Sequence, residues 1–325
     1  MSSIARIVTA CLAVLISMTA AAVAQGYPNR PIRLIISFPP GGSTDVVARS
    51  MQQSLEKRLG QPLIFENKGG AGGNLGVDAV AKSAPDGYTI GFAAAGALAV
   101  NVSLIEKMPF DVTKDLLPIT LVGTSPFILV ASTKFEPSTL KDVIAAAKSK
   151  PGELSIGHGG NGTAMHLTAA LFNQLGGVTT TLVPYRGTGP VTADVVAGHI
   201  PLGIVDAPSA ITQIKSGIVK PIAISSLKRT SSLPDLATFD ELGLKGYESI
   251  GWYGMIAPAG TPPDIIARLN EAMVETLKEP EVAARIRSVG AEPSPMTPEQ
   301  FRSFIQNETA KWAAVIKNGG IKIAN

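Results

Sequence analysis

The chain has 325 residues, of which 45% are hydrophobic, and its 28 basic and 25 acidic residues leave a net charge of +3. This length and apolar content are enough to bury a core in each of two domains. The charge is nearly balanced and no basic run is interleaved with aromatic residues, which argues against binding to nucleic acid.

The first 24 residues have the organisation of a secretory signal peptide. One positive charge precedes an apolar run from Ile7 to about Thr19, and Ala22-Val23-Ala24 forms a small-residue cleavage site. A membrane anchor is the alternative, but the apolar run is short for a membrane span. Cys11 is the only cysteine and lies within this segment, so the mature chain is expected to have no disulfide, no thiolate nucleophile and no cysteine metal ligand. We therefore expect a soluble product outside the cytoplasm.

Apolar strand-like runs alternate with helical patterns along the mature chain. In the first part, we expect strands at 32–37, 62–66 and 88–92 and helices at 46–59 and 77–82. The second part repeats the theme, with strands at 154–156, 181–184, 202–205 and 218–225 and helices at 138–148, 164–173 and 191–197. This alternation predicts an α/β fold with mostly parallel sheets.

The connections suggest how the two parts are joined. Two β-rich runs, 119–122 and 127–131, are expected to lead from the first part to the second, and 251–258 is expected to be a strand that returns. Three helices at 264–278, 280–289 and 298–317 then rejoin the first part. The predicted organisation is a signal peptide at 1–24, a first lobe at 25–124, a second lobe at 125–250 and a return to the first lobe at 251–325.

Each half contains a turn of glycines and hydroxyl residues that opens a helix. The turn at 38–45 offers N–H and O–H donors from Gly41, Gly42, Ser43 and Thr44. A helix N-terminus presents unpaired backbone N–H groups and a partial positive charge, which favour an anion. Gly162 and Thr163 offer the same groups in the second half. We therefore expect a cleft between two lobes, with both turns directed at one ligand.

Several of these side chains also have purely structural explanations, which the sequence leaves open. Ser43, Thr44 and Asp45 could be helix caps, and His166 could be a packed helix residue. The ring of Tyr185 could belong to the core, with Arg186 a solvated charge, and Asp206 could cap the turn before Pro208.

Catalytic patterns are scarce. The three histidines, His158, His166 and His199, lack the spacing of a zinc site, and no glycine-rich stretch fits a nucleotide-binding fingerprint. We expect no cofactor, no metal ion and no enzymatic activity. An exported hydrolase of small esters is the alternative, and its nucleophile would be Ser43 or Thr163 with one of the first two histidines as base.

Six short motifs in order resemble the Bug-type extracytoplasmic solute receptors, the binding proteins of tripartite tricarboxylate transporters, over essentially the whole mature chain. The motifs are Tyr27-Pro28-x-Arg30-Pro31-Ile32, Phe38-Pro39-Pro40-Gly41-Gly42-x-x-Asp45, Glu66-Asn67-Lys68-x-Gly70-Ala71-x-Gly73, Pro85-Asp86-Gly87-Tyr88-Thr89, Val183-Pro184-Tyr185-Arg186-Gly187 and Ala257-Pro258-Ala259-Gly260-Thr261-Pro262.

The resemblance implies a type II periplasmic-binding-protein fold, in which two α/β lobes close on a carboxylate ligand. It implies that one loop grips a carboxylate through backbone amides and water, and that loops of the other lobe complete the site. The positions expected to contact ligand are Phe38, Pro40, Gly41, Gly42, Ser43, Thr44, Asp45, Ala94, Ala95, Asn161, Gly162, Thr163, His166, Tyr185, Arg186, Gly187 and Asp206. The small side chains of Ala93 to Ala95 leave room for a ring or a longer chain.

On this basis we expect a monomeric periplasmic receptor that delivers a small carboxylate to the permease subunits of a membrane transporter. The ligand could be a di- or tricarboxylate, an acidic amino acid or an aromatic acid. A ligand sensor for a membrane signalling partner would use the same fold and cleft, and the sequence does not separate the two.

Overall fold

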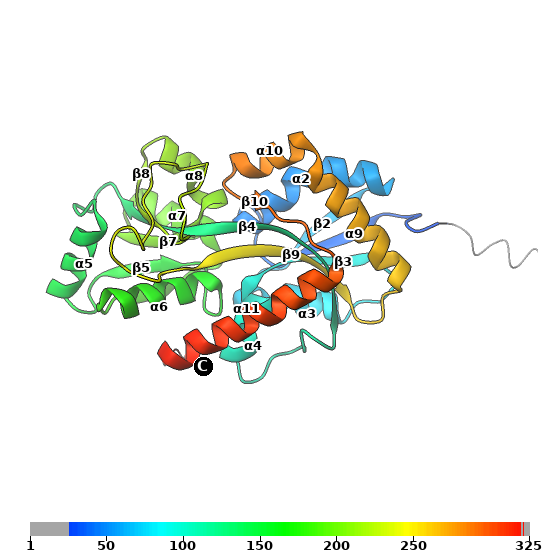
Figure 1. Cartoon of the computed structure of the whole chain (residues 1–325), viewed down its shortest axis with the longest axis horizontal. Coiled ribbons are helices and arrows are strands. Elements are labelled where there is room, and N and C mark those ends of the chain that lie inside the picture. Colours follow the sequence, from blue (N-terminus) through cyan, green and yellow to red (C-terminus); the bar gives the residue numbers. More distant parts are fainter. Residues whose placement is uncertain (1–25, 320, 322–325) are drawn as a thin grey trace, which may run out of the picture.

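The computed structural model describes residues 26–319 and residue 321. The predicted signal peptide, residues 1–24, lies outside the described residues. Ten strands form one sheet in which the main path runs β2-β1-β3-β9-β4-β7-β5-β6, with β8 and β10 paired to β4. The two ends of this path carry separate groups of parallel strands, so the molecule has two α/β lobes (Figure 1).

The first lobe contains three parallel strands and the helices that follow them. Its elements are β1 (Ile32–Ile36), α2 (Ser43–Leu59), β2 (Leu63–Asn67), α3 (Asn74–Ala81) and β3 (Thr89–Ala94), with short turns of helix η1 (Ala71–Gly73), η2 (Gly96–Val100) and α4 (Asn101–Leu104). The predicted helix at 46–59 begins three residues earlier, at Ser43, because Gly42 serves as its N-cap. As a result, Ser43 and Thr44 lie in the first turn of the helix.

The second lobe repeats this arrangement. Its elements are α5 (Leu140–Ser149), β5 (Ser155–His158), α6 (Ala164–Gly176), β6 (Thr181–Pro184), α7 (Thr188–Ala197), β7 (Leu202–Asp206), α8 (Ala207–Lys215) and β8 (Val219–Ile224). Strand β5 pairs in parallel with both β6 and β7. A parallel strand pair needs a crossover connection, and α6 and α7 supply these crossovers.

Two long antiparallel strands, β4 (Leu116–Ser132) and β9 (Ile250–Pro258), pass between the lobes (Figure 1). The separate strands predicted at 119–122 and 127–131 are wrong, because they form one continuous strand. Residues 116–126 of β4 pair with β9, and residues 127–132 pair with β7 and β8. Gly123 and Pro126 lie between the two predicted runs, and pairing with β9 continues through both of them. The predicted boundaries of the lobes, at 125 and 250, stay a prediction.

The C-terminal segment packs largely against elements of the first lobe and against β4. Its elements are α9 (Pro263–Lys278), α10 (Pro280–Ser288), β10 (Glu292–Pro293) and α11 (Pro298–Gly319). Helices α9 and α10 pack on α2, and α11 packs on η2 and β4. Within the described ranges, 26–319 and 321, no helix combines the length and apolar character that a membrane span requires.

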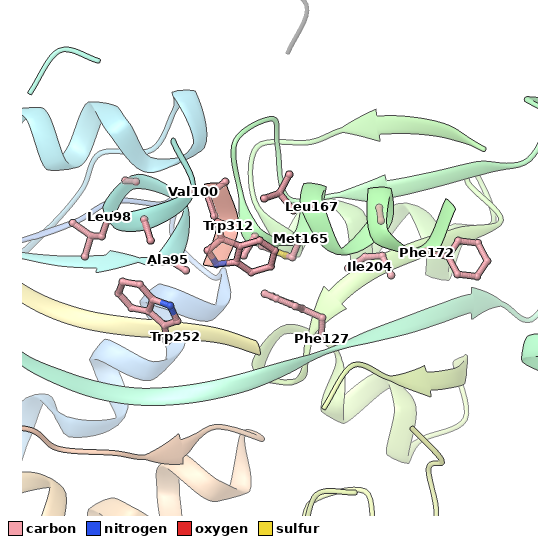
Figure 2. Packing of buried hydrophobic residues seen from close by; sticks show 14 of the residues in the cluster. Ala95, Leu98, Val100, Phe127, Met165, Leu167, Phe172, Ile204, Trp252 and Trp312 are labelled. Atoms are coloured by element: carbon pink, nitrogen blue, oxygen red, sulfur yellow. The ribbon is translucent and has the colours of Figure 1, made fainter. Parts of the chain in front are cut away.

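Buried side chains from several elements gather where the lobes meet the crossing strands (Figure 2). Phe127 comes from β4, Met165 from α6, Trp252 from β9 and Trp312 from α11. The carboxylate of Glu308 accepts hydrogen bonds from both indole N–H groups, at 3.0 Å from Trp252 and 3.2 Å from Trp312. Because both indoles are almost fully buried, Glu308 satisfies two donors that have no access to water.

We predict that Glu308→Ala lowers the free energy of unfolding by about 2 kcal/mol or more, because each orphaned buried donor costs on the order of 1–3 kcal/mol. Urea denaturation measures the change. Gln306→Ala, at an exposed position on the same helix, is the matched control and should change stability little. Equal losses in the two variants would show that the paired indoles do not anchor α11.

Candidate functional site

A cavity lies between the two lobes, with the crossing strands forming one wall. Its lining residues are Phe38, Pro39, Pro40, Gly42, Ser43, Thr44, Ala94, Ala95, Gly96, Phe127, Thr163, Ala164, Met165, Arg186, Gly187, Thr188, Gly189, Pro190, Asp206, Gly251, Trp252 and Tyr253. The first lobe contributes the loop before α2 and the end of β3. The second lobe contributes the segments that open α6, α7 and α8.

The N-termini of four helices converge on this cavity. The first residues of α2, α6 and α7 (Ser43, Ala164 and Thr188) line it, and so does Asp206, which directly precedes α8. Each N-terminus carries unpaired N–H groups and a partial positive charge, so an anion in the cavity is stabilised from several directions. The sequence predicted two such termini, and the structure adds those of α7 and α8.

The lobes approach closely beside the cavity because glycines line the contact. A Cβ atom added to Gly96 would lie 2.8 Å from the backbone oxygen of Gly162 in the other lobe. One added to Gly72 would lie 2.7 Å from the backbone oxygen of Asn161. Contacts this short are not tolerated between a side chain and backbone, so the present approach of the lobes depends on these glycines.

Asp45 stabilises the loop before α2 through its hydrogen bonds. Its carboxylate accepts hydrogen bonds from the Gly41 amide at 3.0 Å, from Arg49 at 2.9 Å and from Asn67 at 3.1 Å. Asn67 also donates to the backbone oxygen of Phe38. Burial raises the pKa of Asp45, but the hydrogen bonds from Arg49, Gly41 and Asn67 outweigh this effect, so its pKa is below the usual value. Asp45 is thus ionised and holds the loop in shape from outside the cavity lining.

Asp206 is a buried carboxyl group surrounded by hydroxyls. Ser209 donates to one carboxyl oxygen at 2.8 Å, and Tyr253 donates to the other at 3.1 Å. Ser43 and Thr188 are further hydrogen-bond partners. Burial raises the pKa of Asp206, and these hydroxyls only partly offset the rise. The group therefore joins α2, α7, α8 and β9 around one carboxyl that is costly to ionise.

The other charged side chain in the lining is Arg186. It is exposed, and within the described part of the chain no ion pair involves it. Its guanidinium is available to a carboxylate at the mouth of the cavity. The same part of the chain holds no group of three or more side chains suited to a metal ion.

The structure brings most of the predicted site residues together. Those that line the cavity are Phe38, Pro40, Gly42, Ser43, Thr44, Ala94, Ala95, Thr163, Arg186, Gly187 and Asp206. Asn161 and Tyr185 line a neighbouring hollow that shares Phe38, Arg186 and Gly187 with the cavity. Gly41, Asp45, Gly162 and His166 line neither of the two. Whether each lining residue contacts a ligand stays a prediction.

Two of the predicted side chains have structural partners instead. The hydroxyl of Tyr185 donates a hydrogen bond to Asp194 at 2.8 Å. Burial and, to a smaller extent, this contact raise the pKa of Tyr185 to about 12. His166 stacks on His158 with 4.8 Å between the ring centroids. Burial lowers the pKa of both imidazoles, that of His158 to about 3 with a further contribution from His166, so the pair is neutral at physiological pH.

Sequence reasoning missed the apolar side of the cavity. Phe127 lies on β4, Trp252 and Tyr253 lie on β9, and Met165 lies in the first turn of α6. Two adjacent aromatic residues on the return strand were the available signal. Adjacent side chains on a strand point to opposite faces of the sheet. The sequence does not reveal which face meets a cleft, because both faces of this strand are buried.

Comparison with known proteins identifies the family. Residues 47–321 match the model described as "Tripartite tricarboxylate transporter family receptor". The chain belongs to this family. The protein BugT of Bordetella pertussis is 39% identical over 301 residues, covering 92% of each chain. The resemblance predicted from the six motifs is confirmed.

Solved structures of family relatives have the same fold. R. palustris Rpa4515 with adipate is 32% identical with a TM-score of 0.89, covering 91% of this chain and 99% of that one. MatC from Rhodopseudomonas palustris with bound malate is 33% identical with a TM-score of 0.85, covering 89% and 100%. The predicted two-lobe periplasmic-binding-protein fold is therefore confirmed.

We predict that Asp45→Asn destabilises the protein by about 1–3 kcal/mol at neutral pH, the range for hydrogen bonds to a charged group. The folded-state pKa of Asp45 is lowered, so this stabilisation is complete above the unfolded value of about 4. It is lost as the pH falls through the folded value, and the two proteins should then converge. Urea denaturation at several pH values measures this.

Asp86→Asn is the control for this prediction, because Asp86 is half exposed and pairs with Arg30 on the surface. Exposed pairs contribute little, so this variant should have near wild-type stability. A pH-independent loss in Asp45→Asn would contradict the role of the charge.

Proposed function

We propose that this receptor captures a small organic carboxylate in the interlobe cavity and delivers it to the permease subunits of a tripartite transporter. The convergence of four helix N-termini on one cavity is the observation that carries the proposal. Charge-assisted hydrogen bonds to backbone amides are strengthened where water is excluded. A carboxylate has the planar oxygens that such donors and the Arg186 guanidinium fit.

The composition of the remaining wall supports an organic body on this anion. Phe38, Ala94, Phe127 and Trp252 contribute apolar surface to the cavity lining. Ligand sites commonly combine such walls with a few convergent polar groups. Two structurally similar receptors have adipate and malate as bound ligands, which are small carboxylates of this kind.

The family and the two-lobe fold support delivery to a permease. A ligand that contacts both lobes favours the closed arrangement, and a membrane partner can recognise that arrangement. In this proposal the predicted signal peptide directs a monomer to the periplasm. A ligand sensor would use the same closure with a signalling partner in place of the permease.

The hydrolase alternative has little support from the geometry. The Thr163 hydroxyl donates a hydrogen bond to the Gly160 oxygen and accepts one from the His166 amide. The Ser43 hydroxyl is hydrogen-bonded to Asp206 and Tyr253. Across the described residues, no hydrogen bond joins either hydroxyl to the ring of His158 or His166. A nucleophile and base within hydrogen-bond reach would be expected of this chemistry.

A thermal-shift screen of mono-, di- and tricarboxylates tests the proposal. A ligand at one hundred times its Kd stabilises the native state by about 2.7 kcal/mol, so at least one clear rise in Tm is expected. A flat screen would contradict carboxylate capture. Ester turnover that disappears in Ser43→Ala would instead support the hydrolase.

Tryptophan fluorescence locates the bound ligand, because the chain has two tryptophans and Trp252 lines the cavity. We predict that Trp252→Phe abolishes the change in emission on ligand addition. Trp312→Phe, the matched control at a buried position on α11, should retain it. The opposite pattern would place the ligand outside this cavity.

A further inference from the structure

Asp206 stands apart from every other acidic side chain in the described part of the chain. Its residue is 2% exposed, it lines the cavity, and none of the ion pairs there includes it. Asp45, the other buried carboxylate, has Arg49 as a partner and lies outside the cavity lining. A cavity suited to an anion therefore has a carboxyl group in its own wall.

The partners of Asp206 do not select one protonation state. All four are hydroxyls, contributed by Ser43, Thr188, Ser209 and Tyr253. A hydroxyl can donate to an ionised carboxylate or accept from a protonated one by rotating about its C–O bond. The cluster can therefore remain hydrogen-bonded when Asp206 gains a proton.

The charged and titratable groups on the elements around Asp206 leave it without a counter-ion. Tyr253 on β9 is neutral because burial raises its pKa far above the usual value. On α2 these groups are the Asp45–Arg49 pair near its start and Glu56, Lys57 and Arg58 near its other end. His158 on β5 and His166 on α6 stack on each other, and Asp194 on α7 is hydrogen-bonded to Tyr185 and His199. The remaining groups are Arg186 at the exposed mouth and Lys215 in the last turn of α8.

We propose, on the basis of the function proposed above, that Asp206 is protonated in the complex and donates a hydrogen bond to a carboxylate of the ligand. Capture of the ligand then takes up one proton from solvent, which forms the O–H bond of the Asp206 carboxyl. The preferred ligand is a carboxylate without an amino group at this position, since an ammonium group would instead require Asp206 to be ionised.

The physical reason is the number of negative charges that the cavity can stabilise. The helix N-termini favour one anion, whereas a ligand carboxylate beside an ionised Asp206 would bring two like charges together without water. Carboxyl groups in such an arrangement share a proton, and the pKa of one rises strongly. Burial already raises the pKa of Asp206 before any ligand arrives, so the ligand adds to an existing tendency.

Isothermal titration calorimetry tests the proposal on the wild-type protein, with adipate, malate and L-aspartate as probes. Measurements at one pH in buffers of different ionisation enthalpy give the number of protons taken up. We expect an uptake of up to one proton with a carboxylate probe. Above the pKa of the free protein, affinity should fall by up to about tenfold per pH unit.

Asp206→Asn is the decisive variant, because an amide keeps the shape and the donor of a protonated carboxyl group and cannot titrate. It should bind the carboxylate with near wild-type affinity at neutral pH, with no proton uptake and a flat pH profile. Above the pKa of Asp206 in the free protein, carboxylate binding without proton uptake would overturn the proposal and leave the receptor function standing. A hundredfold loss of affinity in Asp206→Asn would do the same. L-Aspartate as the preferred probe would also overturn it.

A second measurement needs no ligand. The raised pKa means that folding of the free protein carries a cost that appears as pH rises above the unfolded value of about 4. Asp206→Asn should therefore have a higher Tm than wild type near neutral pH, and the difference should vanish near pH 4. A lower Tm for this variant at neutral pH would show that the charged form is favoured, and would overturn the proposal. Failure of every carboxylate to bind would contradict the receptor function itself.

Discussion

The antiparallel pairing of β4 with β9 is the constraint on which the rest of this structure depends. Both strands run from one lobe to the other, and the sheet of each lobe is built onto them. In open α/β sheets, loops and helix N-termini follow the carboxyl ends of the parallel strands. Because one pair of strands carries both sheets, the N-termini of α2, α6, α7 and α8 meet at one cavity.

This arrangement favours negative charge in the cavity, although few charged side chains line it. The donors are mostly backbone amides, which belong to rigid helices and need no reorganisation when an anion arrives. Asp45, Asn67 and Arg49 keep the loop before α2 in shape from behind. The glycines at the contact between the lobes allow backbone to approach backbone, so the cavity can be closed from water.

Asp206 adds a second constraint to this cavity. A buried carboxyl group without a counter-ion is unfavourable for stability, and such groups tend to lie at functional sites. In the described part of this protein the group lines the cavity, and its hydrogen-bond partners are hydroxyls. Its protonation would link ligand capture to pH, with selectivity between plain carboxylates and amino acids as a consequence.

The sequence by itself determined most of the local elements and the positions of the glycine and hydroxyl turns that open α2 and α6. Alternating periodicities predicted the strands and helices, and glycine with hydroxyl residues marked the starts of α2 and α6, because these signals depend only on neighbouring residues. Only the tertiary structure decided which side chains meet. It directed Tyr185 towards Asp194, stacked His166 on His158, and brought Phe127, Trp252 and Tyr253 into the cavity wall. These contacts join segments far apart in the chain, and their geometry follows from how β4 and β9 hold the lobes together.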